Sequence, residues 1–181
     1  KLRFGSFEKF NGLIDGTVTP IPSKGFTRLK FLTKNFTRLS VLLETYLRAS
    51  EEALADRAFF QASTTIMFFL ISRAVAQIAN HDKIGSFTAS NVPDGTVLLS
   101  IAGGPQAAIG IADHRFSFSR AVPESYHAVM EFGSMELARQ IFEGKASALG
   151  CVGEGLITLR GNLGMLDNIN RILDRVAVYL A

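Results

Sequence analysis

One stretch near the carboxyl end of this chain constrains its fold more than any other. It starts at Gly144-Lys145, continues through small residues, and ends in the run Gly155-Leu156-Ile157-Thr158-Leu159-Arg160-Gly161-Asn162-Leu163-Gly164. Apolar and polar residues alternate in this run, which predicts a strand over 156–160, and the glycines predict a helix end before it and a turn after it. No acid, base or metal ligand is essential to the pattern. It predicts elements that arrange apolar side chains around a space.

The composition is that of a globular chain. Its 181 residues are 48% hydrophobic and 19% charged, and they include 15 Phe, 3 Tyr and no Trp. This length suffices for one well-packed domain with a helical appendage. Phe has no polar group, so this aromatic set is typical of a dry core or of an apolar cavity. Cys151 stands alone, which excludes a disulfide framework and a cysteine-based zinc site.

Positive charge is concentrated in residues 1–48, which hold nine Lys or Arg and three acids. An extended arm is predicted over 1–27 and an amphipathic helix over 28–48. Lys30, Lys34 and Arg38 form a basic ridge on that helix, because they lie four residues apart. Like charges at this spacing cost helix stability unless something anionic faces them. The ridge predicts docking onto an anionic membrane surface or a protein partner, and the alternative is a solvated face. We expect no nucleic acid partner.

The other elements follow from periodicity. A helix over 57–79 falls short of the about 20 apolar residues that span a bilayer, so it is predicted to be a core helix. Residues 83–95 are interpreted as a linker. Four short strands around 97–101, 109–111, 116–119 and 126–132 are predicted to form an antiparallel meander. A short helix over 135–143, a glycine-rich turn at 150–155 and an amphipathic helix over 164–180 complete the pattern.

The sequence contains no recognisable catalytic or metal-binding motif. His81, His114 and His127 do not pair with one another or with Cys151 at a metal-ligand spacing. No Gly-x-Ser-x-Gly nucleophile motif is present, and the glycines at 150–155 lack the Lys-Ser/Thr of a phosphate-binding loop. We therefore predict no catalytic residue, no metal and no cofactor.

The predicted sheet has one strongly apolar face, and the helices that would cover it are rich in Phe and Met. One interpretation is an ordinary packed core. The other is an incompletely filled interior that admits an acyl chain or a sterol, for which adaptable Met and Phe side chains are well suited. The residues alone leave both interpretations open.

From Val97 to Leu173 the sequence resembles the sterol carrier protein type-two family of nonspecific lipid-transfer proteins. The resemblance rests on the strand ending at Gly103-Gly104, the strands that follow it, the helix closing on Gly144-Lys145, and Gly155-x-Ile157-x-Leu159-x-Gly161-Asn162-x-Gly164. It implies an α+β fold, in which a five-stranded, mainly antiparallel sheet is covered by helices around a lipid tunnel. Its ligand classes are fatty acids, acyl-coenzyme A esters, sterols and phospholipids. The apolar sheet face and the resemblance together predict lipid contacts at Phe68, Phe116, Phe118, Met130, Phe132, Leu137, Ile141, Phe142, Ile157, Leu159, Met165, Leu166 and Ile169.

Residues 1–56 have no counterpart in the minimal family domain, which is predicted to occupy 57–181. The extension would cover the cavity, form a homodimer or dock a partner. The sequence ends in Val178-Tyr179-Leu180-Ala181, without the peroxisomal tail of many eukaryotic members. We expect a cytoplasmic lipid carrier, peripheral to a membrane and without catalysis of its own. The alternatives are an accessory protein that presents lipid or isoprenoid intermediates to enzymes in a complex, and a substrate-presenting part of a lipid-modifying enzyme.

Overall fold

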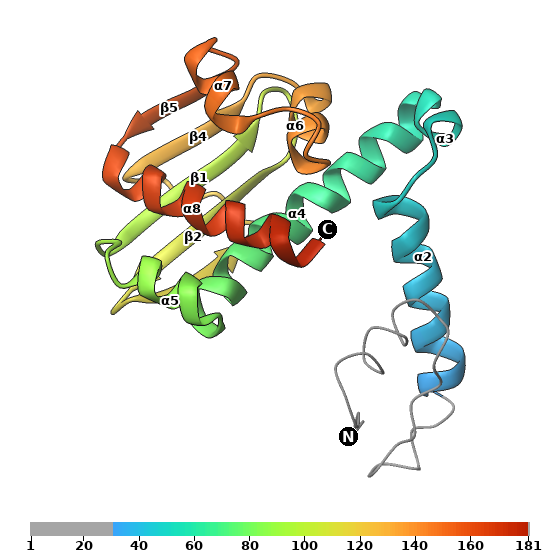
Figure 1. The fold of residues 1–181 in the computed structure, drawn as a ribbon, viewed down its shortest axis with the longest axis horizontal. Coiled ribbons are helices and arrows are strands. Elements are labelled where there is room, and N and C mark those ends of the chain that lie inside the picture. The colour runs from blue at the N-terminus through green and yellow to red at the C-terminus, as the bar shows by residue number, and fades with distance from the viewer. Residues whose placement is uncertain (1–30, 181) are drawn as a thin grey trace. The chain divides into compact units, whose positions relative to one another are not determined.

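The computed structural model describes residues 31–180, and the chain divides into two compact units at Thr45/Tyr46 (Figure 1). In the first unit, the π-helical turn η2 (Phe31–Phe36) leads into α2 (Thr37–Leu47), which continues to the start of the second. The helix predicted over 28–48 is therefore present in its described part. The predicted arm over 1–27 and Lys30 lie outside the described residues. This division lies before residue 56, where the sequence predicts the domain boundary. The predicted boundary stays a prediction.

The second unit is built on a five-stranded sheet with the order β3-β2-β1-β4-β5. The strands are β1 (Gly95–Ile101), β2 (Gln106–Ala112), β3 (Arg115–Ser119), β4 (Ala128–Phe132) and β5 (Ile157–Gly161). Neighbouring strands run antiparallel except β1 and β4, which run parallel with Leu99 opposite Met130. The predicted α+β fold with a mainly antiparallel sheet is confirmed.

The predicted meander is wrong, because β4 does not pair with β3 but lies on the far side of β1. Four of the five β4 residues are buried, Glu131 being the exception. A strand that is apolar on both faces is stable in the interior of a sheet and not at its edge. The connection over 120–127 contains Pro123 and is too long for a tight hairpin, so it carries the chain across to the free edge of β1.

Helices cover one face of this sheet, as Figure 1 shows for α4 and α8. The helices of the second unit are α3 (Glu51–Ala55), α4 (Arg57–His81), α5 (Lys83–Ala89), α6 (Met135–Phe142), α7 (Ala148–Gly153) and α8 (Leu163–Leu180). By length and composition α4 could cross a membrane, but 56% of its most apolar window is buried inside the protein. Phe68 and Val75 of α4 are almost fully buried in the core, which agrees with the predicted core helix.

Two segments without predicted structure are in fact helices. In the predicted linker, the side chain of Asp82 accepts hydrogen bonds from the amides of Ile84 and Gly85 and so starts α5. Gly85 permits close packing on α4, since a Cβ there would lie 2.6 Å from Ile78. In the predicted turn over 150–155, the hydroxyl of Ser147 caps α7. α5 contains one glycine and α7 contains two, and the caps and packing outweigh the low helix propensity of this residue.

The glycines and asparagine of the motif around β5 have structural roles. Gly161 has a φ of 88°, and a Cβ at this position would lie 2.2 Å from the carbonyl oxygen of His127. The side-chain oxygen of Asn162 accepts a hydrogen bond of 3.1 Å from the amide of Met165 and so starts α8. Gly144, with a φ of 70°, ends α6. The motif thus fixes where β5 stops and where α8 begins.

Candidate functional site

Two adjoining hollows lie between β4, α7 and α8. The first has a volume of about 90 Å³ and is lined by Ile71, Met130, Phe132, Ile141, Phe142, Ala148, Asn170, Leu173, Asp174, Val176 and Ala177. The second has a volume of about 250 Å³ and is lined by Met130, Ala148, Leu149, Val152, Leu159, Leu163, Leu166, Asp167 and Asn170. Met130, Ala148 and Asn170 line both hollows, so these three residues lie at the boundary between them.

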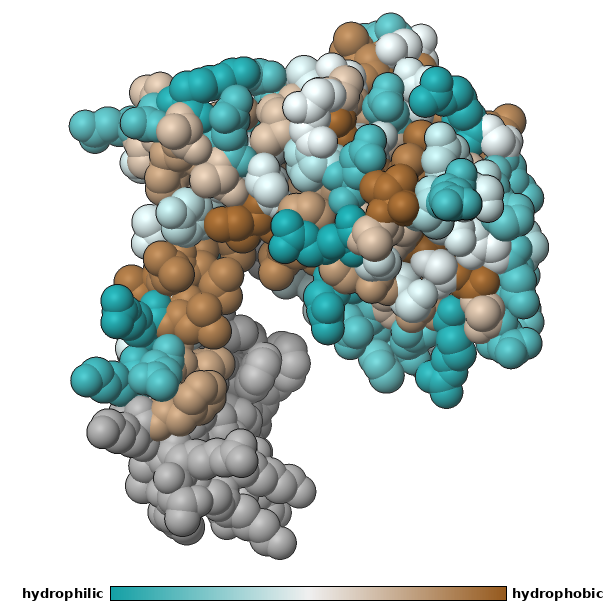
Figure 2. Space-filling model, turned by 180° about the vertical axis from the view of Figure 1, so that it is seen from behind, coloured by the Kyte–Doolittle hydropathy of each residue, from teal (hydrophilic) through white to brown (hydrophobic). Residues whose placement is uncertain are grey.

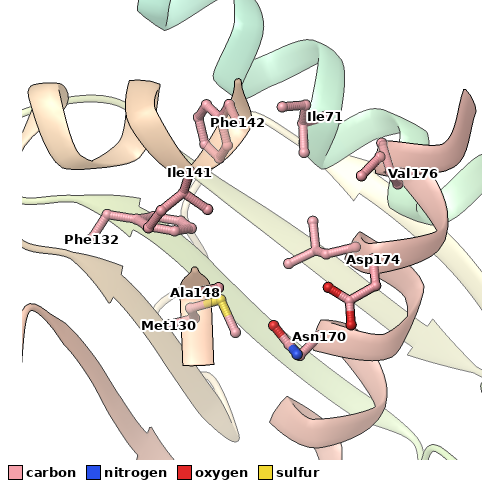
Figure 3. A pocket seen from close by; sticks show the side chains of 11 residues that line it. Ile71, Met130, Phe132, Ile141, Phe142, Ala148, Asn170, Asp174 and Val176 are labelled. Carbon is pink, nitrogen blue, oxygen red and sulfur yellow. The ribbon is translucent and has the colours of Figure 1, made fainter. Parts of the chain in front are cut away.

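The hollows are apolar except on the side of α8. Asp167, Asn170 and Asp174 lie three to four residues apart on this helix and therefore share one face. Figure 3 shows Asn170 and Asp174 beside each other on α8, with Met130 of β4 on the opposite side of the first hollow. Within the described part of the chain, no Lys, Arg or His lines either hollow. The polar side of the site, as far as the structure describes it, thus carries carboxylates and an amide but no basic group.

The predicted lipid contacts fall into two groups. Met130, Phe132, Ile141 and Phe142 line the first hollow, and Met130, Leu159 and Leu166 line the second. The remaining seven lie in the core or pack against it without lining a hollow, and they are Phe68, Phe116, Phe118, Leu137, Ile157, Met165 and Ile169. The role of all these residues in lipid contact stays a prediction.

Sequence reasoning missed the contribution of α7 and the polar residues of α8. Ala148, Leu149 and Val152 belong to a segment that was interpreted partly as a turn, so no inward face was assigned to it. Asn170 and Asp174 belong to the predicted amphipathic helix over 164–180, in which polar side chains are expected on the solvent side. The repeat of Asn170, Asp174 and Ala177 at helical spacing was the available signal.

The wall formed by α6 is held by a buried polar network. The guanidinium of Arg139, only 3% exposed, donates a hydrogen bond of 2.6 Å to the hydroxyl of Ser63 and another to the carboxylate of Glu143. Ser63 in turn donates to the carbonyl of Tyr46. Partial burial raises the pKa of Glu143, but hydrogen bonds from Lys145 and Arg139 outweigh this and hold it below its ordinary value. The network fixes α6 against α4.

The carboxyl-terminal half of α8 is held by Asp82. The guanidinium of Arg175 donates hydrogen bonds of 3.2 and 3.3 Å to the two carboxylate oxygens of Asp82, and the Tyr179 hydroxyl donates one of 2.6 Å. These bonds from Tyr179 and Arg175, and one from the amide of Gly85, hold the pKa of Asp82 well below its ordinary value. Asp82 also raises the pKa of Tyr179. This contact fixes the half of α8 that lines the first hollow.

The contact predicts a dependence of stability on pH. A carboxyl with a lowered pKa stabilises the fold at pH values above the unfolded pKa of about 4, and this contribution is lost as the pH falls towards the folded value. We expect Asp82→Asn to lower the melting temperature by a few degrees near neutral pH, and the difference from the wild type to shrink below pH about 4. Thermal melts followed by circular dichroism across this range measure it. Asp167→Asn, which removes an exposed pair with Arg171, is the matched control and should change little.

The predicted ridge residues that the structure describes, Lys34 and Arg38, are exposed. Every described side chain of η2 and of α2 up to Thr45 is exposed as well, including the apolar Phe36, Leu39 and Leu42. Figure 2 shows apolar residues gathered along α2. The described part of α2 thus presents basic and apolar side chains to solvent together.

Among the residues that the structure describes, no group of three or more His, Cys, Asp or Glu side chains is arranged to hold a metal ion. The ring nitrogen Nδ1 of His127 accepts a hydrogen bond of 3.1 Å from the amide of Thr96, so this histidine joins β4 to β1. It has a structural partner in the sheet and lies outside both lining sets.

Among the comparisons with known proteins, the search of solved structures found matches. No protein-family model and no curated protein matches the sequence. Sterol carrier protein domain 2 of Helicoverpa armigera is similar with a TM-score of 0.49 and 15% identity, over 63% of this chain and 88% of that one. Palmitated sterol carrier protein 2-like 2 of Aedes aegypti gives 0.43 and 16%, over 59% and 90%. A ubiquinone synthesis protein, UbiJ-SCP2, gives 0.42 and 8%, over 67% and 97%. Sterol carrier protein 2 domains are thus among the structures that this chain resembles.

Proposed function

We propose that this protein binds and carries a lipid, whose apolar chain lies in the two hollows between the sheet, α7 and α8. The observation that carries the proposal is the apolar lining of these hollows beside an exposed apolar rim. Leu149 of α7 and Leu163 of α8 both line the second hollow, yet they are 78% and 63% exposed. When a lipid covers large apolar side chains at the mouth of an apolar hollow, apolar surface is removed from water. This burial stabilises the complex by about 0.8 kcal/mol per buried methylene.

The volumes of the two hollows are small for a long lipid chain. The second hollow, of about 250 Å³, exceeds the ~150 Å³ of a cavity that binds benzene but falls below the ~300–1,000 Å³ of sites for larger ligands. A long acyl or isoprenoid chain therefore requires α7 or α8 to move outwards. The contact of α8 with Asp82 holds the far end of that helix, so the movement would begin near Leu163.

Lipid binding is tested by native mass spectrometry of the purified full chain and by titration with Nile red, an uncharged dye that fluoresces in apolar surroundings. We expect a bound lipid mass or, for the apo protein, saturable dye fluorescence that hexadecanol displaces. A clean apo mass together with no saturable dye binding would refute the proposal.

We propose further that α2 docks the carrier, as a cytoplasmic protein, onto an anionic membrane. Lys34 and Arg38 supply positive charge beside the exposed apolar side chains of Phe36 and Leu39. Near an anionic bilayer each basic residue contributes about 1 kcal/mol to binding.

Reversal of these charges is therefore expected to weaken membrane binding. Lys34→Glu/Arg38→Glu should reduce binding to phosphatidylglycerol vesicles by about tenfold or more, and binding to neutral phosphatidylcholine vesicles should stay weak in both proteins. Co-sedimentation with vesicles measures the effect. The matched control Lys83→Glu/Arg115→Glu changes the charge by the same amount in α5 and β3, outside α2. Equal losses in both double variants would attribute binding to overall charge and not to α2.

The exposed apolar side chains of α2 equally favour a second candidate, an accessory protein that presents a lipid to an enzyme. In that case a protein partner would co-purify with the full chain and would be lost when residues 1–48 are removed. Vesicle binding would then be insensitive to Lys34→Glu/Arg38→Glu. The two candidates thus give opposite results in the same pair of measurements.

A further inference from the structure

Among the described residues, the polar side chains that line the hollows are acidic or neutral, and none is basic. Asn170 and Asp174 are the polar side chains that line the first hollow, and Asp167 and Asn170 are those of the second. A carrier of a fatty-acid anion or of a phosphate ester would be stabilised by a basic residue at this place. The described residues of both lining sets provide a carboxylate and an amide instead.

The arginines nearest to these groups in sequence are already paired. Arg171 forms an ion pair of 3.0 Å with Asp167, and Arg175 forms one of 3.2 Å with Asp82. Asp174 lies between them and is exposed, and in the part of the chain that the structure describes it has neither a hydrogen bond nor an ion pair. The amide of Asn170 likewise has no side-chain partner among the described residues. The carboxylate of Asp174 and the amide of Asn170 are thus available to a ligand where the apolar hollow meets solvent.

From this arrangement we infer that the site selects a lipid whose polar end is an uncharged or cationic hydrogen-bond donor, such as a hydroxyl or an amine, and rejects a carboxylate or phosphate. The inference rests on the proposed lipid binding. A hydroxyl donates to the carboxylate of Asp174 and accepts from the side-chain amide of Asn170, so it satisfies both groups. An anionic head offers no donor to Asp174, and its charge is repelled at close range. Asp174 is therefore the specificity-determining residue.

A matched series of ligands with the same chain tests the inference. Hexadecanol, hexadecylamine and palmitate, each below its aggregation concentration, displace Nile red from the full-length protein near neutral pH. We expect the alcohol and the amine to bind at least about tenfold more tightly than palmitate. Asp174→Asn should strengthen palmitate binding by about fivefold or more and leave the alcohol within about threefold. Glu154→Gln, which removes the same charge at an exposed position outside both hollows, should leave all three affinities unchanged.

The outcomes separate this inference from the proposed function. If neither Nile red nor any of the three ligands binds, lipid binding itself is refuted. If palmitate binds the wild type as tightly as hexadecanol does, the carrier stands and the selectivity is refuted. If Asp174→Asn and Glu154→Gln improve palmitate binding equally, the selectivity comes from overall charge and the assignment to Asp174 is overturned. Unchanged circular dichroism spectra of both variants confirm that the comparison is between folded proteins.

Discussion

Replacement of Gly161 by alanine is expected to destabilise the carboxyl-terminal unit by about 3 kcal/mol or more, a large share of the stability of a typical domain. The residue has a φ of 88°, which L side chains rarely adopt, and its new Cβ would lie 2.2 Å from the His127 carbonyl oxygen and 2.9 Å from the Cα of Ala128. Both are backbone atoms of the segment paired with β5, where Ala128 lies opposite Gly161. Relief of the clash must break this pairing or shift the start of α8.

Gly144→Ala separates the two contributions to this effect. Gly144 also has a positive φ, of 70°, but no atom lies within 4 Å of the position that a Cβ would take. Only the backbone conformation is then unfavourable, which costs about 1 kcal/mol. Urea unfolding of both variants, followed by circular dichroism, measures the difference. Similar losses in the two variants would show that the close approach to His127 does not contribute.

The motif was predictable from the sequence because its residues act locally. Alternation from Ile157 to Arg160 has the period of a strand, and Asn162 caps the helix that follows. The apolar repeat of α8 and the fifteen uncharged residues within α4 likewise specify helices without reference to the rest of the chain. These local signals account for the five strands and for most of the helices in the described part of the chain.

Features that depend on distant parts of the chain were not predictable. The parallel pairing of β4 with β1 depends on which sheet edge remains free after the β1–β2–β3 hairpins form, and this is a property of the whole sheet. The helix α5 depends on its packing against Ile78 and on the Asp82 contact with α8. The acidic side of the hollows depends on the rotation of α8, because this rotation decides which polar side chains of the helix border them.

Introduction of a phenyl ring at Ala148 is expected to reduce lipid affinity by at least about tenfold with the fold retained. Ala148 is half-buried, starts α7 and lines both hollows together with Met130 and Asn170. A larger side chain there occupies the boundary of the two hollows, which an apolar chain extending through both would have to cross. Because the ring enters space that is empty in this structure, Ala148→Phe should keep or slightly raise the melting temperature, unlike an insertion into a close-packed core.

Nile red titration and hexadecanol displacement measure the loss, and thermal melting measures the stability. Ala112→Phe, at the exposed end of β2, adds the same ring outside the hollows and should leave affinity unchanged. If Ala148→Phe binds as tightly as the wild type, the lipid lies elsewhere and the hollows are packing defects. If it loses affinity only for long chains and retains short ones, the ligand occupies one hollow and requires the passage at Ala148 to extend into the other.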